Sequence, residues 1–225
     1  MKKLLSSIRS RASTIFHWLK NHLCFNPQQY WDTRADTFGR HSVYNMAHSR
    51  EELNQLDIEL KNRYRSILKK YISEKDADVL DFGCGWGRFS DFLLQIFPGK
   101  IIGVDISKKS IEQNSIHDPR CIFKTMESEK IPLQDQSVDV VFIHLVLGAL
   151  STRQLKVTLA EIDRVSKSNA LFFVVENTDP AKDLYYWHFH TKQEYIQMLS
   201  FAQLEHVVSY LDINEEISIF CGRKR

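Results

Sequence analysis

A run of alternating glycines beside one acidic residue is the part of this sequence with the clearest chemical meaning. Residues 79–87 read Val-Leu-Asp-Phe-Gly-Cys-Gly-Trp-Gly, so an apolar stretch leads into Asp81 and glycines stand at 83, 85 and 87. Glycine adopts positive φ and has no Cβ, so such a loop turns sharply and lets a ligand approach the backbone. A strand, a glycine turn and a helix N-terminus together form a site for a nucleotide-like ligand.

The pattern around this loop predicts strands that alternate with helices. Apolar, β-branched stretches predict seven strands, over residues 77–82, 100–105, 121–126, 138–145, 170–176, 204–212 and 215–223. Helices are expected over 86–97, after Ser107, over 152–166 and over 192–202. Capping boxes are expected at Ser49, Ser151 and Thr191, each followed three residues later by Glu or Gln. Uncharged strands flanked by helices indicate a parallel sheet covered on both faces, and the last two strands indicate an antiparallel hairpin.

The spacing of the glycines indicates which ligand the loop binds. A dinucleotide fingerprint is G-x-G-x-x-G, whereas residues 81–87 follow D-x-G-x-G-x-G, which resembles motif I of class I S-adenosylmethionine-dependent methyltransferases. The resemblance extends over roughly residues 26–223. It implies an α/β fold: a Rossmann-like, seven-stranded, mostly parallel sheet with a C-terminal antiparallel hairpin, helices on both faces and an N-terminal helical cap.

The resemblance also implies an S-adenosyl-L-methionine site and no metal site. The glycine loop would receive the methionine part, Asp105 the ribose hydroxyls, and Glu127 with the amide of Ser128 the adenine. Cys84 is expected to be a small residue that fits a tight turn rather than a reactive thiol. The expected cofactor-binding residues are Tyr30, Asp81, Gly83, Cys84, Gly85, Gly87, Asp105, Ile106, Met126, Glu127, Ser128 and His144.

Histidines are the natural candidates for the base that a hydroxyl acceptor needs, because imidazole exchanges protons near neutral pH. We expect His144, His188 and His190 to be catalytic, although His144 could instead only shape the cofactor pocket. His188 and His190 belong to an aromatic stretch, residues 185–190, that either lines the acceptor pocket or packs on the surface. Residues 30–48 are also rich in aromatics and histidine, and we expect them to fold over the cofactor as a lid.

The acceptor is narrowed mainly by motifs that are absent. Neither Asn/Asp-Pro-Pro-Tyr nor Pro-Cys follows the fourth strand, which disfavours methylation of nucleic-acid bases. The chain is similar to small bacterial methyltransferases of surface-polysaccharide and secondary-metabolite pathways, and this similarity implies a small-molecule or glycan acceptor. We expect O-methylation of a sugar or lipid-linked saccharide. The alternatives are N-methylation of a small amine and a non-catalytic, cofactor-binding partner protein, since Gly148 and Ala149 stand where many relatives have a histidine.

Charge separates the N-terminal segment from the rest of the chain. Of 225 residues with net charge +2, residues 1–25 hold five basic residues and no acid, which leaves −3 for residues 26–225. Such a slightly acidic body argues against a nucleic-acid partner. The segment reads as a basic amphipathic helix, which either lies on a membrane surface, packs on the domain or a partner, or forms a disordered tail.

Composition and patterning together predict one domain with an N-terminal extension. Four scattered cysteines and the absence of a long apolar run indicate a cytoplasmic protein, with peripheral contact at the inner membrane face through the basic helix. We expect residues 26–225 to form the methyltransferase domain, with a lid over 26–75 and a Rossmann-like core over 76–225.

Overall fold

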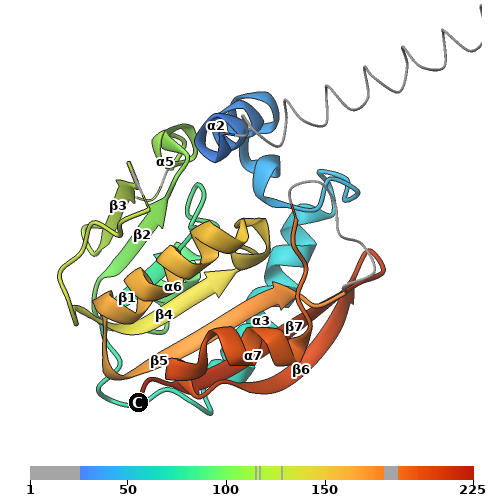
Figure 1. Cartoon of the computed structure of the whole chain (residues 1–225). Coiled ribbons are helices and arrows are strands. Elements are labelled where there is room, and N and C mark those ends of the chain that lie inside the picture. Colours follow the sequence, from blue (N-terminus) through green and yellow to red (C-terminus); the bar gives the residue numbers. More distant parts are fainter. Residues whose placement is uncertain (1–25, 115, 117, 128, 180–186) are drawn as a thin grey trace, which may run out of the picture.

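A seven-stranded sheet organises the computed structural model, which describes residues 26–225 except 115, 117, 128 and 180–186 (Figure 1). The strand order is β3-β2-β1-β4-β5-β7-β6, with β1 to β5 parallel and β7 antiparallel to both β5 and β6. The strands are β1 (Val79–Phe82), β2 (Ile101–Asp105), β3 (Cys121–Thr125), β4 (Val138–His144), β5 (Ser166–Asn177), β6 (Glu205–Asp212) and β7 (Glu215–Arg223). This topology confirms the predicted Rossmann-like sheet and its closing hairpin.

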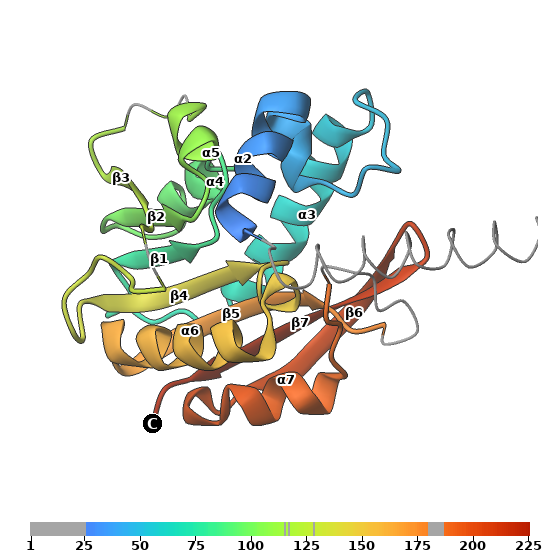
Figure 2. The same cartoon turned by 45° about the horizontal axis from the view of Figure 1, so that its top comes forward.

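Helices cover both faces of the sheet (Figures 1 and 2). They are α2 (Pro27–Phe38), α3 (Leu53–Leu68), α4 (Ser90–Leu94), α5 (Lys108–Glu112), α6 (Thr152–Val165) and α7 (Lys192–Met198), with 3-10 turns η1 (Gly39–Val43), η2 (Leu147–Ala149) and η4 (Ser200–Ala202). One apolar core joins α6 and α7 to the sheet through buried side chains such as Ile162 and Tyr195. A second core joins α3 and α4 to the opposite face through Tyr64 and Phe92. The sheet is therefore buried on both sides, as its uncharged strands require.

Element boundaries follow local capping chemistry where the sequence supplies it. The capping boxes at Ser151 and Thr191 are present and begin α6 and α7 as predicted. At Ser49 only one of the two hydrogen bonds of a capping box forms: the Ser49 amide donates to the Glu52 side chain. Helix α3 begins four residues after Ser49. The helix expected over 86–97 is α-helical only in α4, because Gly87 has φ +86° and keeps the preceding residues in turns.

The segment with weak periodicity before residue 50 is helical in part. Asn26 accepts a hydrogen bond from the Gln29 amide and Pro27 occupies the first turn, so α2 begins there. Helix α2 lies beside α5, above the carboxyl ends of the central strands (Figures 1 and 2). The predicted basic amphipathic helix over residues 1–25 lies outside the described residues and stays a prediction. Within the part that the structure describes, no helix is long and apolar enough to cross a bilayer.

Glu176, near the end of β5, positions the turn that follows β4. Its side chain is 1% exposed and accepts hydrogen bonds from the amides of Val146 (2.9 Å) and Leu147 (2.7 Å), with Gly148 at 3.4 Å. Glu176 therefore caps the turn that follows β4 through these amides. Burial raises the pKa of Glu176 to about 7, and the three amides offset only part of that rise.

Glu176→Gln should change how stability depends on pH. Because the folded pKa of about 7 exceeds the ordinary value of 4.5, the folded state holds this proton longer, so the wild type loses stability as pH rises from about 4.5 to 7. Glutamine does not ionise. The free energy of unfolding of the wild type minus that of the variant, measured by urea titration, should therefore be highest near pH 5 and fall towards pH 8.

The control for this titration is Glu59→Gln, at an exposed glutamate of α3. Its difference from wild type should stay within about 0.5 kcal/mol at every pH. A pH-independent difference for Glu176→Gln would show that this carboxyl titrates normally in the folded protein.

Candidate functional site

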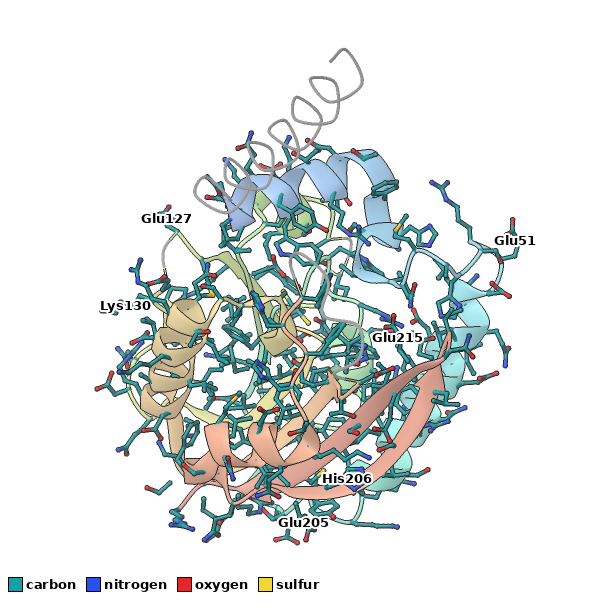
Figure 3. All side chains as sticks on the ribbon, turned by 45° about the vertical axis from the view of Figure 1, so that its right-hand side comes forward. Glu51, Glu127, Lys130, Glu205, His206 and Glu215 are labelled. Carbon is teal, nitrogen blue, oxygen red and sulfur yellow. The ribbon has the colours of Figure 1, made fainter. Side chains whose placement is uncertain are left out.

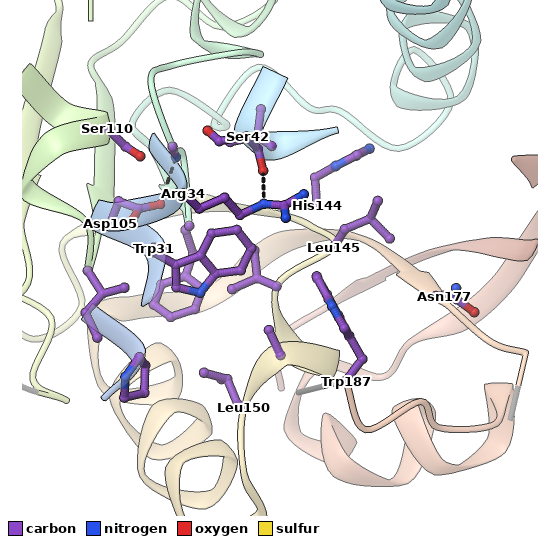
Figure 4. A pocket seen from close by; sticks show the side chains of 18 of the residues that line it. Trp31, Arg34, Ser42, Asp105, Ser110, His144, Leu145, Leu150, Asn177 and Trp187 are labelled. Atoms are coloured by element: carbon purple, nitrogen blue, oxygen red, sulfur yellow. Dashed lines mark hydrogen bonds between the residues drawn. The ribbon is translucent and has the colours of Figure 1, made fainter. Parts of the chain in front are cut away.

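A cavity of about 420 Å³ lies at the carboxyl ends of the parallel strands (Figure 4). Its wall includes Phe82 at the end of β1, Asp105 at the end of β2 and His144 at the end of β4. Open α/β sheets bind their ligands at this edge, and the volume suits a ligand of nucleoside size. The cavity therefore lies where the sequence predicts the cofactor.

The glycine loop forms the floor of one end of the cavity. Gly83 and Gly85 both line it, with φ of +72° and +55°, in the left-handed region that side chains disfavour. A Cβ added at Gly85 would lie 2.8 Å from Val43 Cγ1, so the absence of a side chain lets the end of η1 lie close over the loop. The backbone here can approach a ligand directly, as the motif predicts.

Asp105 holds the glycine loop and the start of α5 together. Its Oδ2 accepts from the Gly85 amide at 2.8 Å and its Oδ1 accepts from the Ser107 amide at 2.7 Å. Burial raises the pKa of the Asp105 carboxyl, although these amides act in the opposite direction. Each carboxylate oxygen has a further lone pair, so Asp105 can still accept hydrogen bonds from a ligand in the cavity.

The turn after β3 contributes residues next to those predicted. Met126 lines the cavity as expected, and so does Glu129, which the sequence did not single out. Glu127 is exposed and lies at the outer edge of the molecule (Figure 3), outside the cavity wall. Ser128 lies outside the described residues. The carboxylate that this turn presents to the cavity is thus that of Glu129.

Several other predicted cofactor residues support the site from behind rather than lining it. Asp81 is 3% exposed and accepts from the Ser90 hydroxyl at 3.0 Å; burial, with a contribution from Asp105, raises its pKa to about 7. Cys84 is buried, its thiol pKa is raised by burial, and a Cβ at Gly103 would meet its Sγ at 2.8 Å. These contacts match the expectation that Cys84 is a small packing residue.

Of the remaining predicted cofactor residues, Tyr30 and Gly87 do not line the cavity. Trp31 and Arg34 line the cavity, whereas Tyr30 does not, because positions three apart share one face of α2. Gly87 is also outside the wall, and Ile106 lies in it as predicted.

The three predicted catalytic histidines lie in different environments. His144 lines the cavity, and its Nε2 lies 3.0 Å from the Tyr64 hydroxyl. Burial, assisted by the charge of Arg88, lowers the pKa of His144 well below its usual value. His188 is exposed, and the His190 ring packs edge-on against Tyr195 with centroids 5.4 Å apart.

In the described part of the aromatic stretch, residues 187–190, alternate side chains face the cavity. Trp187 and Phe189 line it, with ring centroids 6.1 Å apart, while His188 and His190 do not. Side chains alternate in an extended chain, so a two-residue period would have separated these pairs in the sequence. Trp187 meets Trp31 of α2 edge-on at 6.2 Å, and both reach the cavity in Figure 4.

The far end of the cavity is built from elements that are distant in sequence. It includes Asn177 at the end of β5 and Asp212 and Glu215 at the β6–β7 turn. The Asn177 amide donates to Glu215 at 2.9 Å, and His48 Nε2 lies 2.6 Å from Asp212 Oδ1. Sequence reasoning missed these three wall residues, since no local pattern indicates that the hairpin tip reaches the cavity.

Comparison with known proteins gives this site a family. Residues 79–169 match a family model described as a methyltransferase domain. The chain is 30% identical over 125 residues to malonyl-[acyl-carrier protein] O-methyltransferase of Hamiltonella defensa, covering 56% of this chain and 46% of that protein. It is 32% identical over 103 residues to the mouse eEF1A lysine and N-terminal methyltransferase, covering 44% and 15%. The matches thus span less than half of either relative.

Solved structures share the fold at low sequence identity. The YcgJ protein of Bacillus subtilis superposes with a TM-score of 0.61 at 16% identity, covering 73% of this chain and 98% of that one. An S-adenosylmethionine-dependent methyltransferase from Aquifex aeolicus gives 0.58 at 20% identity, covering 77% and 98%. Residues 79–169, which include the glycine loop, are thus similar to a methyltransferase domain, and the strand order belongs to the Rossmann-like fold that these solved structures share.

Proposed function

We propose that the protein transfers a methyl group from S-adenosyl-L-methionine to a hydroxyl oxygen of a saccharide. The observation that carries this proposal is the continuity of the cavity. One end holds the glycine loop and Asp105, and the other holds two tryptophans and several oxygen-bearing side chains. A donor and an acceptor placed in one enclosed space can react in line, with water excluded.

The cofactor end has the groups that a nucleoside with an amino-acid tail requires. The backbone at Gly83 and Gly85 would lie against the methionine part, and the Asp105 carboxylate would accept from the ribose hydroxyls. Ile106 and Met126 offer apolar surface for the adenine beside the Glu129 carboxylate. When bound, S-adenosylmethionine supplies a methyl group on a positively charged sulfur, which leaves as a neutral thioether. The protein's task is therefore alignment and, for a hydroxyl acceptor, proton removal.

The acceptor end supports a polyhydroxylated ring. Trp31 and Trp187 offer broad apolar faces at low conformational cost, and Asn177, Asp212 and Glu215 offer oxygens that accept from hydroxyl groups. Among the described residues of the cavity wall, Arg34 is the one arginine or lysine. It donates to the Ser42 carbonyl at 2.7 Å. This balance favours a neutral acceptor over an anionic one. The relative from Hamiltonella defensa is itself an O-methyltransferase, which supports oxygen as the atom methylated.

The proposed base is His144, the predicted catalytic histidine that lines the cavity. Its lowered pKa keeps the ring neutral at pH 7, so the ring is available to a proton from the acceptor hydroxyl, and the same burial makes it a weaker base than a free imidazole. When the acceptor oxygen takes the methyl group that the cofactor would supply, the His144 ring would receive the hydroxyl proton. Tyr64, within 3.0 Å of Nε2 and of the Tyr210 hydroxyl, orients this ring.

We extend the proposal to a lipid-linked saccharide. The basic, amphipathic sequence of residues 1–25 would hold the domain at the inner membrane face, where such an acceptor is exposed to the cytoplasm.

A small amine is the second candidate acceptor. The same wall supports it, because tryptophan faces and carboxylates attract cations. An amine would lose its proton before attack, and the carboxylates of Asp212 and Glu215 would oppose that loss, which places the amine second.

Asp105→Ala should weaken binding of S-adenosylmethionine at least tenfold. The variant removes an acceptor from two ribose hydroxyls and frees the Gly85 and Ser107 amides from their partner. Isothermal titration calorimetry measures the affinity, and Glu127→Ala, at an exposed acid outside the cavity wall, is the matched control. Unchanged affinity in Asp105→Ala would refute the ribose assignment.

His144→Asn should lower kcat at least a hundredfold with little change in the affinity for S-adenosylmethionine. Such a loss is typical of removing a general base. His188→Asn, at an exposed ring, is the matched comparison and should retain activity if His144 is the base. Full turnover by His144→Asn would exclude this role and leave the ring as a wall of the pocket.

The acceptor class is tested by release of S-adenosylhomocysteine from purified enzyme with panels of sugars, lipid-linked saccharides and small amines. The proposal would be supported if sugars cause release of S-adenosylhomocysteine and if Trp187→Ala raises the KM for the sugar tenfold. Release with amines alone would select the second candidate. Cofactor binding with no release on any panel would favour a non-catalytic, cofactor-binding protein.

A further inference from the structure

We infer that Asp32 is a positioning residue that fastens helix α2 over the bound cofactor through Ser107. This inference rests on the proposed function, because it assumes that Asp105 holds the ribose. It adds a residue that does not itself line the cavity.

The contacts of Ser107 connect the two carboxylates. The Ser107 hydroxyl donates to Asp32 Oδ1 at 2.8 Å, while the Ser107 amide donates to Asp105 Oδ1 at 2.7 Å. Asp32 Oδ1 also accepts from the Lys109 amide at 3.1 Å. Ser107 is 1% exposed, so its own two bonds are largely shielded from water, whereas the bond from the Lys109 amide is exposed. One residue thus contacts both the ribose-binding acid and the helix above the cavity.

The N-cap contact of α5 does not depend on Asp32. The Ser107 hydroxyl oxygen already accepts from the Ser110 amide at 3.0 Å, which is the ordinary N-cap contact for this short helix. Asp32 comes from α2, 75 residues earlier in the chain, and adds an acceptor for the Lys109 amide in the first turn of α5. Its contacts therefore join the start of α5 to a second element, α2.

Helix α2 has little apolar anchorage of its own. Ala35 is its one buried residue, and its packing partners are chiefly α5 and η1 (Figure 2). A second polar contact, from the Gln113 side-chain amide to the Ala35 carbonyl at 3.1 Å, lies on the same side. Since apolar burial contributes little here, polar contacts to α5 determine how firmly α2 stays in place.

The position of α2 matters to the cavity because of the residues beside Asp32. Trp31 lines the cavity, and so does Arg34, which donates to the Ser42 carbonyl and orients the next stretch of wall (Figure 4). Loosening α2 should therefore open the cavity on the side that α2 covers without changing the contacts of Asp105 with Gly85.

The test compares release of S-adenosylhomocysteine from three variants of the full chain. Asp32→Ala should raise the dissociation rate constant at least tenfold, measured by stopped-flow tryptophan fluorescence. Asp32→Asn keeps an oxygen that can accept both hydrogen bonds, so it should release the ligand within threefold of wild type. The matched control is Asp36→Ala on the same helix, where an exposed carboxylate lies 3.9 Å from Lys109 Nζ. It should behave as wild type.

Hydrogen exchange distinguishes local loosening of α2 from general destabilisation of the protein. In Asp32→Ala, amides of residues 27–38 should exchange faster while those of β1 and β4 keep their protection. Wild-type release from Asp32→Ala, or lower thermal stability with unchanged release, would overturn the inference. Failure of the wild type itself to bind S-adenosylhomocysteine would instead overturn the proposed function, and the inference with it.

Discussion

The site depends on how one partly enclosed carboxylate, that of Asp105, is satisfied. A carboxylate removed from water requires hydrogen-bond donors, and here the donors are backbone amides of Gly85 and Ser107. Those two bonds fix the glycine turn after β1 against the start of α5. Hydrogen bonds from the Gly83 and Cys84 amides to the Val104 carbonyl hold the same turn against β2. The geometry of the cofactor end thus follows from two adjacent parallel strands and the side chain at the end of one of them.

The sheet and the cofactor end could be predicted from the sequence because their signals are local. Strand patterning, capping residues and the acid that ends β2 each occupy a short stretch of chain, and parallel strands bring their ends to one edge. Gly83, Gly85, Asp105, Ile106 and Met126 accordingly all line the cavity. After β3 the exposed Glu127 and the cavity-lining Glu129 are two positions apart, and single-sequence reasoning could not fix which of the two faces the cavity.

The acceptor end could not be predicted to the same degree, because tertiary contacts decide it. Asp212 and Glu215 belong to a hairpin whose pattern indicates strands but not the direction in which its tip bends. His48 meets Asp212 from 164 residues away. The composition of the aromatic stretches indicated that they contribute to the cavity wall, but not which of their side chains face the cavity. The period of three in α2 selects Trp31 rather than Tyr30, and the period of two selects Trp187 rather than His188.

The two ends of the cavity are also held together by different forces. The cofactor end stands on strands buried in two apolar cores, so a change there disturbs the sheet itself. The cover and the acceptor wall are joined mainly by polar contacts: Asp32 with Ser107, Arg34 with the Ser42 carbonyl, and His48 with Asp212. Such contacts can be exchanged at modest cost to stability. The fold can therefore keep its cofactor end while the wall formed by α2, Trp187, Phe189 and the β6–β7 turn changes.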